Sequence, residues 1–113
     1  MEPAFNGDGY PNEETLQRIE TWPWRDVAGC LDYARAAWHW PDWVGEELSD
    51  AERELVHAAP GDRFVRFATG GWSGNEDVVH ALGRNVMVRA RCWCLSASGG
   101  LHIYRYPRAE RQS

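Results

Sequence analysis

The residues most able to do chemistry form one glycine-rich loop, GGWSGN, at positions 70 to 75. It lies between a run that is typical of a strand, residues 63 to 69, and a run that is typical of a helix, residues 75 to 82. Backbone amides at such a junction point outward and carry the positive end of the helix dipole, which attracts an anion. We therefore predict a ligand-binding loop made of Gly70, Gly71, Trp72, Ser73, Gly74 and Asn75.

The same loop also has a purely structural interpretation. Ser73 and Glu76 have the spacing of a capping box, in which the serine caps the helix and the glutamate bonds back to it. Three glycines around one tryptophan indicate positive φ angles or the close approach of another group. The loop matches neither the Walker nor the dinucleotide-binding pattern, and Glu76 and Asp77 repel an anion. The structural interpretation is the favoured one, and the ligand-binding one stays open.

Positive charge gathers in the second half of the chain. Residues 1 to 62 contain fourteen Asp and Glu against four Arg, whereas residues 63 to 113 contain three acids against eight Arg. The chain has no lysine, so every fixed positive side chain is a guanidinium, which binds phosphate or carboxylate through a planar fork. Arg66, Arg89, Arg91 and Arg105 fall on predicted strands, and we expect several of them to share a sheet face near the loop. The alternative is a solvated sheet face, or pairing with the protein's own acidic half.

Other chemistries have weaker support. Glu76 and His80 share a helix face, but the further ligands of a zinc site are missing at a recognisable spacing. Ser73 lacks the GxSxG context of a nucleophile elbow. The three cysteines are interpreted as reduced, buried thiols. These patterns predict no catalytic residue, no metal site and no cofactor.

Helices are predicted for the first half of the chain. Asn12 caps the first helix, which ends at Pro23, and the second spans residues 26 to 40 with apolar residues at helical spacing. Ser49 and Glu52 form a capping box for a short third helix, whose apolar face we expect at residues 51, 55, 56 and 59. The chain contains seven tryptophans, and an aromatic wall at the helix ends is expected from Trp22, Trp24, Trp38, Trp40 and Trp43.

The second half predicts a small sheet. The strand at residues 63 to 69 is followed by the loop and a helix, and residues 86 to 106 are expected to form a β-hairpin around the SASGG turn. The fold class is therefore α+β, with N-terminal helices packed on a small, mainly antiparallel sheet. The length of 113 residues suits one domain, which we place at residues 11 to 107. Residues 1 to 10 are predicted to be a flexible leader, and residues 108 to 113 a flexible tail.

Composition also limits location and partners. The chain has no apolar run of the roughly 20 residues that span a bilayer, and its N-terminus has neither a basic region nor an apolar stretch. We expect an intracellular protein with no membrane partner. The net charge of -5 predicts that the protein does not bind duplex DNA alone, because duplex binding requires neutralisation of many phosphates.

The string TGGWSGNE, at residues 69 to 76, resembles a marker of a family of small uncharacterised proteins from bacteriophage and prophage genomes. GYPNEE at residues 9 to 14, WHWPDW at residues 38 to 43, and the Gly99–Gly100 pair before an aromatic strand are similar to that family too. The resemblance implies a phage or prophage accessory protein, acting by binding in the cytoplasm of a bacterial host, for instance against a host defence. Arg89 and Arg91 stand where the family has apolar or aromatic residues.

Three hypotheses for function follow. The first is a non-enzymatic binding protein that holds an anionic, nucleotide-like ligand with the loop, the arginines and stacked rings. The second is a protein inhibitor whose acidic helical half occupies a host defence complex or a nucleic-acid-binding complex. The third is a metal-dependent enzyme that uses Glu76, Asp77 and His80.

Overall fold

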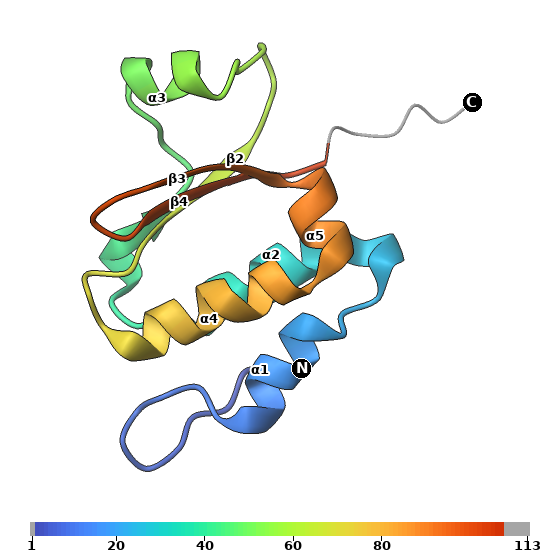
Figure 1. Ribbon diagram of the computed structural model, residues 1–113, viewed down its shortest axis with the longest axis vertical. Coiled ribbons are helices and arrows are strands. Elements are labelled where there is room, and N and C mark those ends of the chain that lie inside the picture. The colour runs from blue at the N-terminus through green and yellow to red at the C-terminus, as the bar shows by residue number, and fades with distance from the viewer. Residues whose placement is uncertain (1, 108–113) are drawn as a thin grey trace.

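The computed structural model describes residues 2–107, in which helices cover a four-stranded antiparallel sheet (Figure 1). The strands are β1 (Val44–Gly45), β2 (Phe64–Ala68), β3 (Trp93–Ala97) and β4 (Leu101–Arg105), in the order β1-β2-β4-β3. The helices are α1 (Glu13–Glu20), α2 (Val27–Ala36), α3 (Asp50–Leu55), α4 (Ser73–Arg84) and α5 (Val86–Arg91), with short 3-10 helices η1 (Trp24–Asp26) and η2 (Pro41–Trp43). The predicted α+β class is confirmed. The predicted flexible tail, residues 108 to 113, lies outside the described residues.

The first three helices begin where the sequence predicts. The Asn12 side chain accepts a hydrogen bond from the Thr15 amide at 2.8 Å, and Asp26 accepts one from the Gly29 amide at 3.2 Å. Ser49 forms the predicted capping box with the third residue of α3. None of the helices within residues 2–107 combines the length and the apolar character that crossing a bilayer requires.

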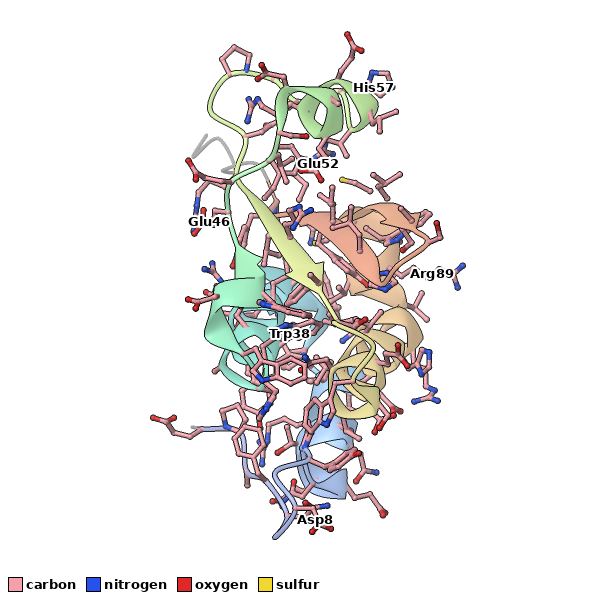
Figure 2. The ribbon with its side chains drawn as sticks, turned by 90° about the vertical axis from the view of Figure 1, so that its left-hand side faces the viewer. Asp8, Trp38, Glu46, Glu52, His57 and Arg89 are labelled. Atoms are coloured by element: carbon pink, nitrogen blue, oxygen red, sulfur yellow. The ribbon has the colours of Figure 1, made fainter. Side chains whose placement is uncertain are left out.

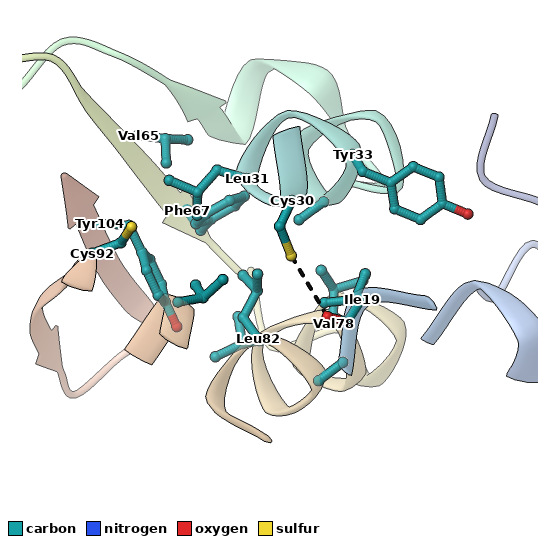
Figure 3. Close-up of a cluster of buried hydrophobic side chains, with 14 of the residues drawn as sticks. Ile19, Cys30, Leu31, Tyr33, Val65, Phe67, Val78, Leu82, Cys92 and Tyr104 are labelled. Atoms are coloured by element: carbon teal, nitrogen blue, oxygen red, sulfur yellow. Dashed lines mark hydrogen bonds between the residues drawn. The ribbon is translucent and has the colours of Figure 1, made fainter. Parts of the chain in front are cut away.

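The sheet separates two clusters of buried side chains. Val65 and Phe67 point from β2 toward α1, α2, α4 and α5 and belong to the main core (Figure 3). Phe64 points to the other side, where it packs with Val56 beneath α3. The predicted alternation of β2 is therefore confirmed. The apolar face predicted at residues 51, 55, 56 and 59 is right at Val56, which is buried, and wrong at Leu55, which is 64% exposed.

The predicted strand at residues 86 to 95 is wrong in its first half. Residues Val86–Arg91 form α5, and β3 begins only at Trp93. Asn85 explains the helix, since its side-chain oxygen accepts a hydrogen bond from the Val88 amide while its side-chain amide donates to the Ile19 carbonyl. Val88 and Cys92, four residues apart, are both buried, so a helical period buries this segment better than strand alternation does.

The N-terminal segment lies against the start of α1. The Ala4 amide donates to Thr15 Oγ1 at 2.8 Å, and Thr15 Oγ1 donates to the Ala4 carbonyl at 3.0 Å. A β-bridge joins Phe5 and Pro11. The flexibility of residues 1 to 10 stays a prediction, but these bonds give residues 4 to 12 a defined place beside the helix.

Candidate functional site

The glycine-rich loop connects β2 to α4, as the sequence predicts. Gly70 and Gly71 have φ angles of 64° and 76°. Only glycine adopts this left-handed conformation without strain. The prediction of positive φ angles in the loop is confirmed.

The glycines also make room for two indole rings. A Cβ atom at Gly70 would overlap the Trp43 ring, and a Cβ atom at Gly74 would overlap the Trp72 ring. Gly74 lies in the first turn of α4, and its φ angle is not positive. Glycine is therefore required there because it has no side chain, and not because of its backbone freedom. Glycines surround the tryptophan because large rings pack directly on this backbone.

Ser73 does not cap α4. The helix begins at Ser73 itself, Trp72 occupies the N-cap position, and no side chain bonds to the first amides. The Ser73 hydroxyl donates instead to the Tyr10 hydroxyl at 3.0 Å. The predicted capping box of Ser73 and Glu76 is therefore wrong, because the chain enters the helix one residue too early for Ser73 to act as its cap.

Some polar groups of the loop are bonded within the protein, whereas the backbone amides of Gly70, Ser73, Gly74 and Asn75 make no hydrogen bond with another described residue. The Trp72 amide donates to the Thr69 carbonyl at 3.1 Å, and the Gly71 amide donates to Thr69 Oγ1 at 3.3 Å. Asn75 is fully buried, accepts a hydrogen bond from the His39 amide at 2.9 Å, and donates to the carbonyls of His39 and Thr69. These bonds favour the structural interpretation of the loop.

Of the four predicted arginines, two share a sheet face, Arg66 and Arg105, and the other two do not lie on the sheet. Arg89 and Arg91 lie on α5, because that segment is a helix. Arg66 lies on the α3 side of β2, where its guanidinium contacts the Glu52 carboxylate at 3.1 Å. Arg105, on β4, lies on the same side of the sheet as Arg66. Figure 2 shows Arg89 on α5, away from Glu52 beside α3.

A pocket of about 380 Å³ lies between the α4–α5 pair and the β3–β4 hairpin. Small-molecule sites have volumes of roughly 300 to 1,000 Å³, so a small ligand fits. Among the predicted site residues, Arg89 lines this pocket. The lining consists of Val79, His80, Gly83, Arg84, Arg89, Trp93, Ser96, His102 and Tyr104.

A hydrogen-bond chain crosses the hairpin wall of the pocket. Trp93 Nε1 donates to Ser96 Oγ at 2.8 Å, and Ser96 Oγ lies 2.8 Å from His102 Nδ1. Ser96 and His102 are register partners on β3 and β4. Residues three apart on a regular strand face opposite sides, but an irregularity in β3 between Trp93 and Leu95 brings Trp93 and Ser96 to the same face. The three polar groups therefore line one wall.

The charge of the pocket is positive. Arg84 lies 2.9 Å from the Glu20 carboxylate, which leaves part of its guanidinium for other partners. Arg89 makes no hydrogen bond or ion pair with another residue of the range 2–107. No carboxylate is found among the described residues that line the pocket. Anions are therefore the ligands that this lining attracts.

Burial shifts the pKa values of two side chains in the hairpin wall, His102 and Tyr104. Burial, together with the nearby charge of His80, lowers the pKa of His102 below its ordinary value. Burial likewise raises the pKa of the Tyr104 phenol, which keeps its proton at neutral pH. At neutral pH the hairpin wall therefore offers neutral hydrogen-bonding groups, and the arginines supply the charge.

Sequence reasoning missed most of this pocket. Arg84, Trp93, Ser96 and His102 come from three different elements, and the segment that carries Arg89 was expected to be a strand. A usable signal was present, because Ser96 is the first residue of the SASGG string and His102 follows it by two residues, at positions that pair across the hairpin. The position of Trp93 depends on the irregularity in β3, which the spacing of residues in the sequence does not indicate.

The residues of the metal hypothesis, Glu76, Asp77 and His80, all lie on α4. Within residues 2–107 no group of three or more histidine, cysteine or carboxylate side chains is placed to hold a metal ion. Of the three cysteines, all free, Cys30 and Cys92 are buried as predicted, whereas Cys94 is only half-buried. Burial is the main cause that raises the pKa values of Cys30 and Cys92 to about 12 and about 11. Such thiols stay protonated and unreactive.

Comparisons of the chain with protein-family models, with curated proteins and with solved structures gave no match.

Proposed function

We propose that this protein binds a small anionic, nucleotide-like ligand in the pocket between α4–α5 and the β3–β4 hairpin. The observation that carries the proposal is Arg89, which lines the pocket and has no carboxylate partner within residues 2–107. A guanidinium binds phosphate or carboxylate through paired N–H donors. Arg84 adds a second guanidinium, which binds the ligand while it stays paired with the Glu20 carboxylate.

The hairpin wall supplies the rest of the proposed recognition. Trp93 is 45% exposed and lines the pocket, so its indole face is available to a planar ring. Stacking of a base on an aromatic side chain contributes about 1 to 3 kcal/mol. When His102 Nδ1 carries the proton and donates to Ser96 Oγ, the Ser96 hydroxyl hydrogen is left to donate to a sugar or phosphate oxygen. Anion donors beside an exposed ring favour a nucleotide over a simple anion.

The proposal gives the glycine-rich loop a supporting role. Trp72 contacts the rings of Tyr10, His39 and Trp40, at centroid distances of 4.7, 4.4 and 5.9 Å. Its faces are therefore engaged by neighbouring side chains, whereas Trp93 is not part of such a cluster. Arg66, the other arginine expected near the loop, is paired with Glu52. The binding site of this proposal accordingly lies at α5 and the hairpin.

Isothermal titration calorimetry tests the proposal with a matched pair of variants. Arg89→Gln removes the charge that lines the pocket, and Arg91→Gln removes an exposed charge from the same helix outside the lining. Nucleoside monophosphates, cyclic nucleotides and inorganic phosphate serve as ligands. We expect nucleotides to bind more tightly than phosphate, and Arg89→Gln to weaken binding about ten- to a hundredfold, since a hydrogen bond to a charged group contributes about 1.5 to 3 kcal/mol. Equal loss in both variants, or no nucleotide binding, would contradict the proposal.

We also propose that this binding serves a phage or prophage accessory role, as the resemblance of the TGGWSGNE string implies. The proposed role is binding without a chemical step. The pocket, with its anion donors and the exposed Trp93 ring, supports the binding part of this proposal.

A further inference from the structure

Five side chains form a continuous aromatic surface at the loop end of the sheet: Tyr10, His39, Trp40, Trp43 and Trp72. Ring centroids of neighbouring members lie 4.4 to 5.9 Å apart. Trp40 and Trp43 are nevertheless 40% and 45% exposed. Tryptophans that combine firm packing with exposure are typical of binding hot spots, because they offer a large contact area at a low cost in entropy.

The exposed rings of the aromatic surface are held in place by the backbone beneath them. Trp40 has a φ angle of 65°, a left-handed conformation that is costly for a residue with a side chain. The Trp43 amide donates to the Trp40 carbonyl at 2.9 Å, which closes a tight turn between the two indoles. The Trp43 ring also occupies the space left by Gly70. The strained backbone at Trp40 therefore holds the indoles of Trp40 and Trp43 at the surface.

Uncompensated negative charge lies beside these indoles. Asp42 lies between Trp40 and Trp43. It lines a hollow of about 320 Å³ together with Val44, Gly45, Glu46, Glu47 and Arg66, and the Arg66 guanidinium is paired with the Glu52 carboxylate. Hydrogen bonds from Arg63 and Arg35 occupy Glu46 and lower its pKa to about 2. Asp42 and Glu47 make no ion pair or hydrogen bond with another described residue. Their charges are therefore free to meet a cation from outside.

The same region presents an open strand edge. Strand β1 is the first strand in the sheet order and pairs only with β2 among the described strands. Its other edge offers the backbone groups of Val44 and Gly45 beside the acidic hollow. An extended segment of another chain can add to such an edge through main-chain hydrogen bonds, while side-chain sites beside it give specificity.

We propose that the aromatic surface, together with Asp42, Glu47 and the β1 edge, binds an extended, arginine-containing segment of a partner protein. The exposed indole faces take guanidinium groups, because a cation over a tryptophan face is attracted by the ring quadrupole. The carboxylates of Asp42 and Glu47 supply the charge that an arginine requires. This inference is independent of the anion pocket, whose arginines attract the opposite charge.

Selection from a displayed library of random peptides tests the inference. We expect the enriched peptides to be rich in arginine, and salt to weaken their binding. Trp43→Ala should weaken binding at least tenfold, and Asp42→Asn several-fold. Trp24→Ala should have no effect, because Trp24 is an exposed tryptophan in η1, 55% exposed, outside the aromatic surface.

Asp42→Asn keeps the test valid if Trp43→Ala fails to fold, since Asp42 makes no hydrogen bond or ion pair with another described residue. Enrichment of acidic or purely apolar peptides would overturn the inference. So would the absence of any enriched peptide, or equal binding by the wild type and both surface variants. Self-association of the wild type that Trp43→Ala abolishes, without peptide binding, would assign the surface to a second copy of this chain and would also overturn it.

Discussion

Replacing Gly74 by alanine tests how the loop is built. In an exposed helix interior, alanine is about 1 kcal/mol more favourable than glycine, so the helix alone predicts stabilisation. The structure predicts the reverse, because the new Cβ would overlap the Trp72 ring and the ring would have to move. Gly83 is the matched control, since it lies in the same helix and its Cβ would meet nothing within 4 Å.

The size of the effect follows from the contacts of Trp72. The ring touches three others, those of Tyr10, His39 and Trp40. An aromatic pair contributes about 0.5 to 1.5 kcal/mol beyond the area it buries. Loss of two or three such contacts at about 1 kcal/mol each, less a helical gain of about 1 kcal/mol, gives a net destabilisation of about 1 to 2 kcal/mol for Gly74→Ala. Gly83→Ala should stabilise by up to about 1 kcal/mol.

Thermal unfolding followed by circular dichroism measures both variants. For a domain of this size, 1 kcal/mol shifts Tm by about 4 °C, so Gly74→Ala should lower Tm by about 4 to 8 °C and Gly83→Ala should raise it. The double change Gly74→Ala with Trp72→Ala should be no less stable than Trp72→Ala alone, because the obstructing ring is gone. If Gly74→Ala is as stable as Gly83→Ala, Trp72 does not need the glycine and the reasoning is wrong.

Three further predictions concern stability. Gly70→Ala should destabilise by about 1 kcal/mol more than Gly71→Ala, because both lose a left-handed glycine but only the first displaces the Trp43 ring; equal urea midpoints would refute this. Asn85→Ala should cost about 1 to 3 kcal/mol in urea unfolding, because it removes the cap of α5 and the hydrogen bond that the Asn85 side-chain amide donates to the Ile19 carbonyl of α1; an unchanged free energy of unfolding would show that the cap is dispensable. The pKa of Glu46 falls from 4.5 to about 2 on folding, so its contribution to stability is complete above pH 4.5 and is lost as the pH falls toward 2. Glu46→Gln should therefore lower Tm at neutral pH and make Tm less dependent on pH over that range, and an unchanged acid slope would contradict this.

The part of the fold that local sequence signals determine could be predicted. Asn12 and Ser49 each cap a helix as expected, because capping depends on residues within one turn. The alternation of side chains between the two faces of β2 could be predicted equally well, since each face packs against its own cluster of buried side chains. The helix at residues 86 to 91 could not be predicted, because the apolar residues of this run fit both the helical and the strand period. The contact that decides between them, Asn85 with α1, joins segments far apart in the chain.

The candidate site could be predicted only in part. Arg89 was identified as an anion-binding residue, but its place on a helix and its neighbours across the hairpin were not. The pocket depends on tertiary packing of α4 and α5 against β3 and β4, and on the irregular pairing that turns Trp93 toward Ser96. The loop glycines were read correctly as sites of close approach, but the approaching groups are the protein's own indole rings.

The central claim is that a nucleotide-like anion binds between α5 and the hairpin, and the Trp93 indole N–H reports on it directly. This N–H donates to Ser96 in the pocket wall, whereas the amides of Gly70 and Gly71 report on the loop. Proton–nitrogen correlation NMR during titration with a nucleoside monophosphate follows all three resonances in one sample. We expect the Trp93 indole resonance to shift in a saturable way, with the loop amides nearly unchanged, and the shift to disappear in Arg89→Gln. Saturable shifts of the Gly70 and Gly71 amides with a stationary Trp93 resonance would contradict the claim and place the ligand at the loop.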